Sequence, residues 1–280
     1  MTLKTVSGKD LNPIGIGTWD VNSKRNPDNL SSKYGGVDPV KGNEDKAIEA
    51  IRYSISKGQN NIDCAELYGS FYTDEVVGQA IEGQSRNDIF IGDKLWKTSL
   101  ANGTVRPTFD NMLQKLKTDY LDMLTIHAPF ADTPWQEAIP QIDELINEGV
   151  VHHFGVSNFS IEQMKEAMSL SRHPLEANQM NFNLLYRDEV NQEFVDFCEE
   201  NNIAIIAYQP IKRGEVMHNE TIIKIAQQHS ATPAQVALAW LLRLEAMPIP
   251  KALSKEHIDE NFEALNLKLT DEEFAELNAI

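Results

Sequence analysis

The feature that most restricts the fold of this chain is a regular alternation of short apolar runs with longer amphipathic runs. Eight apolar runs have the length of buried strands, and segments with apolar residues at helical spacing lie between them. Such alternation indicates a parallel sheet with right-handed crossovers. Eight units close most simply into an α/β (β/α)8 TIM barrel, with a doubly wound open sheet as the alternative. The predicted strands are 14–19, 60–64, 88–94, 120–127, 151–156, 176–181, 203–208 and 248–251.

Helix boundaries can be predicted from capping residues. Ser160 with Gln163, and Thr232 with Gln235, have the spacing of a capping box, in which each side chain bonds the other's backbone. An N-terminal β-hairpin is expected around residues 3–11, and extra helices are expected at the C-terminal end. The predicted helices are 43–57, 73–82, 104–117, 134–148, 161–170, 189–200, 220–228, 232–244, 255–264 and 270–278.

The end of the first predicted strand argues against the open sheet. It reads Gly15-Ile-Gly17-Thr-Trp, without the Gly-x-Gly-x-x-Gly that a dinucleotide site places there in a doubly wound fold. A barrel commonly needs about 250 residues, so we expect residues 1–280 to form a single (β/α)8 domain.

Charge and composition exclude several functional classes. The net charge of −17 argues against nucleic acids and anionic membranes as partners, because both select basic surfaces. The two cysteines, Cys64 and Cys198, are too far apart for a metal-ligand spacing, so no metal is expected. Neither a signal peptide nor an apolar run of membrane-spanning length is present. We therefore expect a cytoplasmic protein, and a monomer.

Four ionisable side chains follow three successive predicted strands. Each alone has a commoner structural explanation, such as a turn aspartate or a solvated lysine. Together, at strand ends that converge on one barrel mouth, they predict a site that donates a proton to a carbonyl. A nearby ammonium would lower the pKa of a phenol, and a carboxylate would hold that ammonium. The residues are Asp63, Tyr68, Lys94 and His127.

Several ordered motifs support the same site. They include Asp63-Cys-Ala-Glu-Leu-Tyr68-Gly, Lys94-Leu-Trp96, the run from Asp119 to His127, Gly155-Val-Ser-Asn-Phe159, and Asn178-Gln179. Through these motifs the chain resembles the aldo-keto reductase family, in particular its bacterial members similar to diketogulonate reductases. The resemblance extends from Gly15 to about Ala275.

The resemblance implies an NADP-dependent oxidoreductase that reduces small aldehydes or ketones to alcohols. Tyr68 would donate the proton, Lys94 and Asp63 would tune it, and His127 would orient the substrate carbonyl. Ser157, Asn158 and Gln179 would bind the nicotinamide carboxamide, and Tyr208 would stack on the nicotinamide ring. Gly17, Thr18 and Trp19 complete the near part of the implied cofactor site.

The segment from Pro250 to Asn261 resembles the part of the family that binds the adenosine phosphate. The positions where the family commonly has serine and arginine hold Ala252 and His257 here. Arginine grips a phosphate bidentately and histidine does not, so NADPH is favoured while NADH remains possible. The implied residues are Lys251, Ser254, His257, Glu260 and Asn261.

The substrate pocket is expected to be lined by Trp19, Trp96 and Phe130, whereas Trp135 is expected in the core. Residues 20–42 read as a long loop that is either a lid or a surface insertion. Two other functions remain open. One is a non-catalytic nicotinamide-cofactor-binding regulatory subunit of the same fold, and the other is a barrel isomerase or lyase acting on phosphorylated sugars.

Overall fold

The computed structural model describes residues 8–21, 23–25, 37–39 and 44–280, with only the backbone for 23–25 and 37–39. Most of the predicted N-terminal hairpin, including its first strand, lies outside these residues, and residues 8–15 form no strand. Part of the predicted loop 20–42 is instead a two-stranded antiparallel sheet of β2 (Ser23–Arg25) and β3 (Val37–Pro39).

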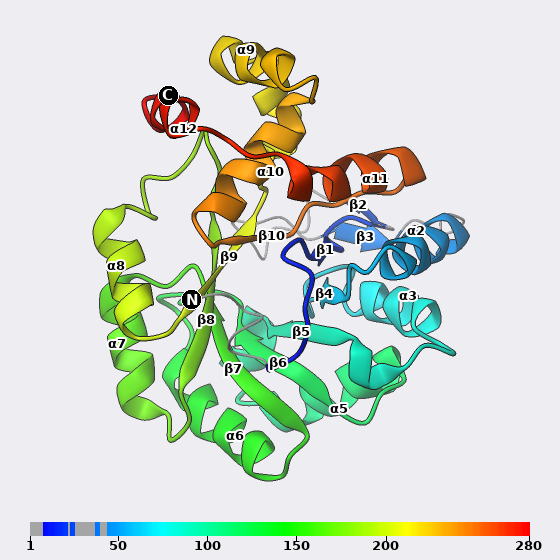
Figure 1. Cartoon of the computed structure of the whole chain (residues 1–280). Coiled ribbons are helices and arrows are strands. Elements are labelled where there is room, and N and C mark those ends of the chain that lie inside the picture. Colours follow the sequence, from blue (N-terminus) through cyan, green and yellow to red (C-terminus); the bar gives the residue numbers. More distant parts are fainter. Residues whose placement is uncertain (1–7, 22, 26–36, 40–43) are drawn as a thin grey trace.

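Eight parallel strands form one sheet in the order in which they follow along the chain, as the alternation predicts (Figure 1). The first and last strands are only two residues long, shorter than predicted. The strands are β1 (Ile16–Gly17), β4 (Asn61–Asp63), β5 (Phe90–Leu95), β6 (Leu121–Ile126), β7 (Val151–Ser157), β8 (Leu175–Asn181), β9 (Ala204–Tyr208) and β10 (Met247–Pro248).

Two backbone hydrogen bonds join the edge strands and close the barrel. Gly15 N donates to Pro248 O at 2.9 Å, and Gly17 N donates to Pro250 O at 3.1 Å. A Cβ atom on Gly17 would lie 2.4 Å from Ile249 O, so no other residue fits this close approach. The glycines of the first strand therefore serve the barrel seam.

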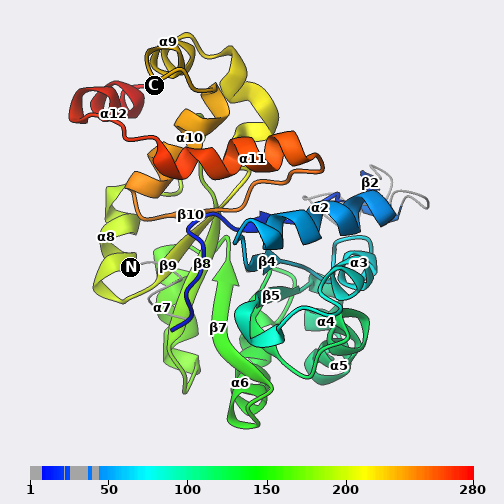
Figure 2. The same ribbon diagram turned by 45° about the vertical axis from the view of Figure 1, so that its right-hand side comes forward.

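Helices surround the strands on the outside of the barrel (Figure 2). Both predicted capping boxes are present, at the start of α7 (Ile161–Leu170) and of α10 (Pro233–Arg243). The short helix α4 was not predicted, because five residues show no helical period. The helices are α2 (Glu44–Ser56), α3 (Tyr72–Ala80), α4 (Lys97–Ala101), α5 (Val105–Leu116), α6 (Trp135–Asn147), α7 (Ile161–Leu170), α8 (Gln192–Glu200), α9 (Glu220–Gln228), α10 (Pro233–Arg243), α11 (Lys255–Glu263) and α12 (Asp271–Asn278).

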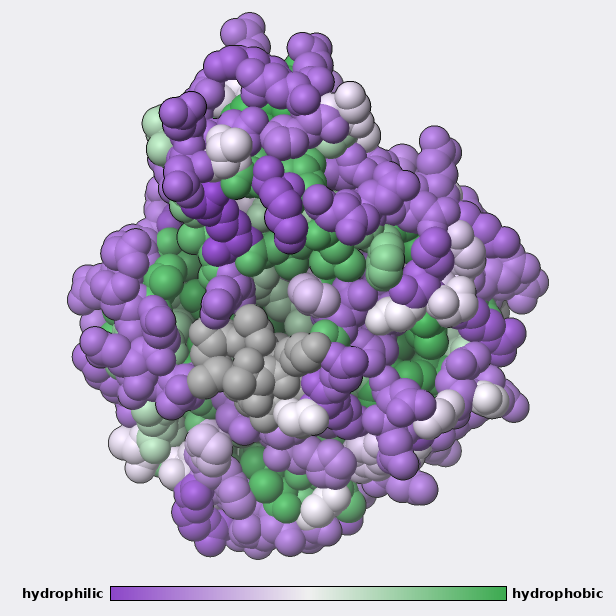
Figure 3. Space-filling view, viewed as in Figure 1, coloured by the Kyte–Doolittle hydropathy of each residue, from purple (hydrophilic) through white to green (hydrophobic). Residues whose placement is uncertain are grey.

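The core lies between the helices and the strands, and a smaller cluster fills the barrel interior. A cavity of only about 20 Å³ remains inside the barrel, so the interior is packed rather than open. Hydrophilic residues cover much of the outer helices on the face shown in Figure 3, and hydrophobic residues gather in the hollows between them. Among the residues described, no helix is long and apolar enough to cross a membrane.

Candidate active site

A buried ion pair lies at the carboxyl ends of two neighbouring strands. Asp63 ends β4 and Lys94 lies near the end of β5, and both side chains are at least nine-tenths buried. Lys94 Nζ donates to Asp63 Oδ1 at 2.5 Å and to the carbonyl oxygen of Cys64 at 2.7 Å. Gln179 Nε2 donates to the same Asp63 oxygen at 2.7 Å. The predicted pairing of Asp63 with Lys94 is confirmed, and these hydrogen bonds offset part of the cost of burying two charges.

Tyr68 lies over this ion pair in the turn before α3. Its Oη is 3.3 Å from Lys94 Nζ and 3.3 Å from Asp63 Oδ2. The expectation of a lowered pKa for Tyr68 is wrong for this geometry, because other effects outweigh the attraction of Lys94. Burial raises the pKa of Tyr68 well above its usual value, and the Asp63 carboxylate raises it further. Tyr68 is therefore protonated at neutral pH, the state that a proton donor needs.

His127 follows β6 and is packed against aromatic rings. Its ring centroid lies 6.0 Å from that of Tyr68 and 4.7 Å from that of Trp96. Burial lowers the pKa of His127 well below its usual value, and the charge of Lys94 adds to the effect. Its Nδ1 has no hydrogen-bond partner among the described residues. A neutral ring of this kind can donate one hydrogen bond without adding a second cation to the site.

We expect the His127 ring to stay neutral between roughly pH 5.5 and 8, where an unperturbed histidine titrates. Its ¹⁵N chemical shifts, assigned with the variant His127→Asn, should remain constant over this range. A midpoint for His127 near the ordinary histidine value would contradict the buried environment described above.

A hydrogen-bonded chain connects the predicted nicotinamide residues to the ion pair. Tyr208 Oη donates to Asn158 Oδ1 at 2.9 Å, and Asn158 Nδ2 donates to the carbonyl oxygen of His127 at 3.1 Å. Ser157 Oγ donates to the carbonyl oxygen of Gln179 at 2.9 Å. Asn158 has a φ of 61°, a left-handed conformation that asparagine tolerates better than most residues. These four side chains therefore lie together at the ends of β7, β8 and β9.

The first strand contributes one residue to the mouth and two to the barrel wall. The ring of Trp19 stacks on Tyr68 with centroids 6.0 Å apart. Thr18 is fully buried and its hydroxyl donates to the carbonyl oxygen of Asp63, while Gly17 contacts the backbone of Ile249. In this structure Thr18 and Gly17 therefore hold the strand ends together, and their contact with a cofactor stays a prediction.

Two further aromatic residues lie beside His127. The rings of Trp96 and Phe130 meet edge to face, with centroids 4.8 Å apart. Trp135 instead packs on Phe159 and is 4% exposed, so its prediction as a core residue is confirmed. Trp96 therefore packs against His127, one of the tetrad Asp63, Tyr68, Lys94 and His127, and Phe130 packs against Trp96.

The five residues predicted for the adenosine end lie around the start of α11. Ser254 caps this helix by accepting from His257 N at 3.3 Å. His257 Nδ1 lies 3.1 Å from Glu260 Oε2, and Asn261 is buried one turn further on. Lys251 Nζ lies 3.7 Å from Asp20 Oδ2. A lysine near a helix N-terminus favours a bound anion, so this donor set suits a phosphate.

A group of buried acids behind the ion pair was not predicted from the sequence. Glu66 accepts from Trp96 N at 2.7 Å and from Ser99 Oγ at 2.8 Å. Asp74 on α3 and Asp93 on β5 are fully buried. The available signal was the carboxylate of Asp93 in a strand that is otherwise apolar up to Lys94.

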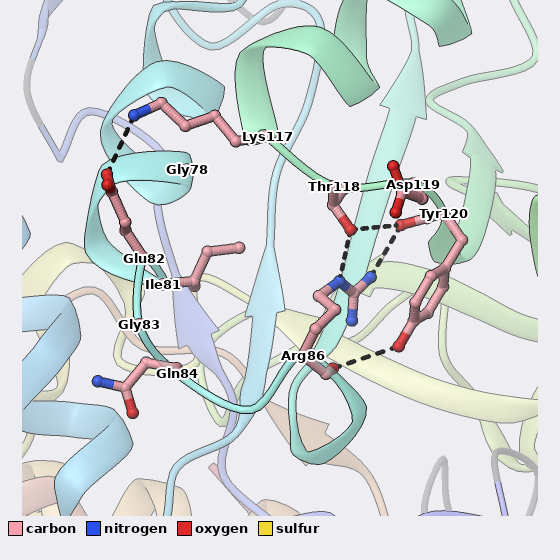
Figure 4. A pocket seen from close by; sticks show the side chains of 10 residues that line it. All are labelled: Gly78, Ile81, Glu82, Gly83, Gln84, Arg86, Lys117, Thr118, Asp119 and Tyr120. Atoms are coloured by element: carbon pink, nitrogen blue, oxygen red, sulfur yellow. Dashed lines mark hydrogen bonds and ion pairs between the residues drawn. The ribbon is translucent and has the colours of Figure 1, made fainter.

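A separate recess of about 380 Å³ lies at the opposite end of the strands, beside the segments that precede β5 and β6 (Figure 4). Three of the charged groups that line it form ion pairs. Lys117 pairs with Glu82 at 3.1 Å, and Arg86 pairs with the buried Asp122 at 2.8 Å. None of the tetrad residues lines this recess, so it is not the candidate active site.

Known proteins resemble this chain over most of its length. The family model described as "Aldo/keto reductase family" matches residues 13–280. A glyoxal reductase of Bacillus subtilis is 29% identical over 240 residues, covering 85% of this chain and 84% of the relative. The methylglyoxal reductase DkgB of Yersinia pestis is 31% identical over 233 residues, covering 81% and 85%.

Solved structures that are similar to this chain are also described as aldo-keto reductases. The thermostable aldo-keto reductase Tm1743, in complex with the inhibitor epalrestat, superposes with a TM-score of 0.88 at 33% identity, covering 97% of this chain and 96% of the other. An aldo/keto reductase from Klebsiella pneumoniae, in complex with NADP and acetate, has a TM-score of 0.83 at 29% identity, covering 96% and 91%.

Proposed function

The chain belongs to the aldo/keto reductase family, and from this premise we propose that it is a nicotinamide-dependent carbonyl reductase acting on small aldehydes and ketones. The observation that carries the proposal is the buried contact of Tyr68 with the Asp63–Lys94 ion pair, with a neutral His127 beside it. This arrangement can give a proton to a carbonyl oxygen and then accommodate the charge that remains on the phenol.

The nicotinamide cofactor supplies the hydride for the carbonyl carbon when it is bound. Ser157, Asn158 and Gln179 would hold its carboxamide, because these side chains offer both donors and acceptors at one place. Tyr68 donates its proton to the carbonyl oxygen as that oxygen gains charge. Lys94 stabilises the phenolate that results, and Asp63 holds Lys94 in reach of it.

The proposed substrates are small aldehydes and dicarbonyl compounds. The relatives named as glyoxal and methylglyoxal reductases support this class, as does the small residue Ala128 next to His127. The apolar rings of Trp19, Trp96 and Phe130 would line the pocket. They would surround Tyr68 and His127, the two polar groups proposed to contact the carbonyl. We further propose a single-domain monomer.

Steady-state oxidation of NADPH and NADH with a panel of aldehydes, dicarbonyls and keto sugars tests the proposal. We expect turnover with small dicarbonyls, and a higher kcat/KM with NADPH than with NADH. Cofactor binding without turnover on any carbonyl would instead fit a regulatory subunit of the same fold. Absence of cofactor binding would overturn the assignment of the barrel mouth as a nicotinamide-cofactor site.

NADPH binding is expected to weaken as pH rises through the range in which a histidine loses its proton. The reason is that a 2′-phosphate at the start of α11 would be contacted by His257, which replaces the arginine common in the family. Fluorescence titration of NADPH between about pH 6 and 8 measures the effect, with NADH as the control because it has no 2′-phosphate. Equal pH dependence for both cofactors would exclude a phosphate contact of His257.

A further inference from the structure

Two fully buried carboxyl groups lie directly behind the catalytic lysine. Asp93 precedes Lys94 on β5, and successive side chains of a strand point to opposite faces. Lys94 therefore reaches the barrel mouth, whereas Asp93 faces the helix layer. There it meets Asp74 from the first turn of α3, close enough for a hydrogen bond between the two carboxyl groups. Both residues are 0% exposed.

The pair has unmet hydrogen bonds. Asp93 Oδ1 accepts from the backbone N of Lys94 at 2.7 Å. Asp93 Oδ2 and both carboxylate oxygens of Asp74 have no donor within the described part of the chain. Two ionised carboxylates in contact, with three oxygens lacking donors, would be very costly in a buried site. One proton held between the two groups removes the repulsion and supplies the missing donor.

Other charges surround the pair. Burial raises the pKa of both carboxyl groups, that of Asp93 to about 7, although the nearby Lys94 opposes the shift. The pair therefore changes its charge close to neutral pH, next to the ion pair that contacts Tyr68. Four titratable groups act on the pair. They are Asp63 at the end of β4, Cys64 directly after it, Glu66 in the following turn, and Lys94 on β5.

We propose that Asp74 and Asp93 share one proton and act as positioning residues for the reaction, fixing the Lys94 backbone and setting the electric field at Tyr68. The idea rests on the proposed carbonyl reduction. At low pH each carboxyl group holds its own proton. When Asp93 loses its proton near neutral pH, the pair gains one negative charge behind Lys94, and the two groups then share the proton that remains. Tyr68 then holds its proton more tightly and donates it more slowly, so the reaction slows as pH rises through the titration of the pair.

The first test is the pH profile of single-turnover NADPH oxidation with methylglyoxal. In the wild type we expect a several-fold fall between roughly pH 6 and 8, since one unit of pKa corresponds to a tenfold change. In the double variant Asp74→Asn with Asp93→Asn, the step should disappear, because neither amide titrates. A matched control is Asp143→Asn on α6, a carboxylate that is equally buried but bonded to Ser171 and Arg172. This control should keep the wild-type profile.

The second test does not depend on activity. A native pKa near 7 lies above the unfolded value of about 3.9, so the native state keeps a proton that the unfolded state has lost. The contribution to the free energy of unfolding is fully present below about pH 4 and is lost as pH rises to about 7. Urea unfolding across this range should show a steeper decline in the wild type than in the double variant.

The outcomes separate the two proposals. If the wild type reduces no carbonyl, the proposed function fails, and the unfolding data still decide whether the proton is shared. If turnover is normal but the double variant retains both wild-type pH profiles, the shared proton is excluded. Should the double variant not fold, Asp74→Asn alone replaces the shared proton by an amide donor. Asp93 can still ionise in this variant, and the amide hydrogen bond to its carboxylate should move the step to lower pH, whereas an unmoved step would exclude contact between the two groups. A uniform loss of rate with an unchanged profile would show a merely structural role.

Discussion

Replacement of Tyr68 by phenylalanine is expected to lower kcat by about 10²- to 10⁴-fold, the usual contribution of a positioned proton donor. The ring itself should remain in place, because it stacks on Trp19 and is 7% exposed. NADPH affinity should therefore be nearly unchanged. Steady-state kinetics give the loss of kcat, and fluorescence titration gives the affinity.

A control for this substitution is the free energy of unfolding, which should change little, because the hydroxyl makes only long contacts of 3.3 Å. Retention of most of the wild-type kcat would mean that another group donates the proton. His127 is the neighbouring candidate, and the double variant Tyr68→Phe with His127→Gln would then identify it.

Replacement of Lys94 by methionine is expected to abolish measurable turnover and to reduce the free energy of unfolding by about 3–5 kcal/mol. The substitution keeps the length of the side chain but leaves the Asp63 carboxylate buried without its cation. Gln179 continues to donate to that carboxylate, which limits the loss. Chemical unfolding by urea, followed by intrinsic tryptophan fluorescence, measures the change.

The pH dependence of unfolding and a second substitution show whether the unpaired Asp63 carboxylate causes the loss of stability. Without Lys94 the native pKa of Asp63 should rise above its unfolded value, so the variant is less destabilised at low pH and more destabilised as pH rises. Adding Asp63→Asn to Lys94→Met should recover stability but not activity. If the double variant is as unstable as Lys94→Met alone, lost packing rather than an unpaired charge explains the effect.

The position of the tetrad was accessible from the sequence because it depends on topology. Parallel strands in chain order bring their carboxyl ends together, so residues at the ends of β4, β5 and β6 must meet. The protonation state of Tyr68 was not accessible in this way. It depends on how completely the phenol is buried and on which partner its hydroxyl faces, and these follow from tertiary packing.

The buried acid pair shows the same limit. Asp74 in the first turn of α3 reads as an ordinary favourable charge at a helix N-terminus. Asp93 reads as a polar residue within a strand. Only the packing of α3 on β5 brings the two carboxyl groups into contact. The β2–β3 hairpin was missed for a related reason, since its strands are short and lack an apolar pattern.

The seam between the first and last strands affects how the barrel folds during synthesis on the ribosome. The partner of Gly15 and Gly17 is the segment from Pro248 to Pro250, which the ribosome synthesises after all the other strands of this sheet. A sheet that lacks this segment would present β1 and β9 as open edges, which are prone to pair with other chains. The seam therefore forms only after the last strand has been made, and Lys251 meets Asp20 only with that closure.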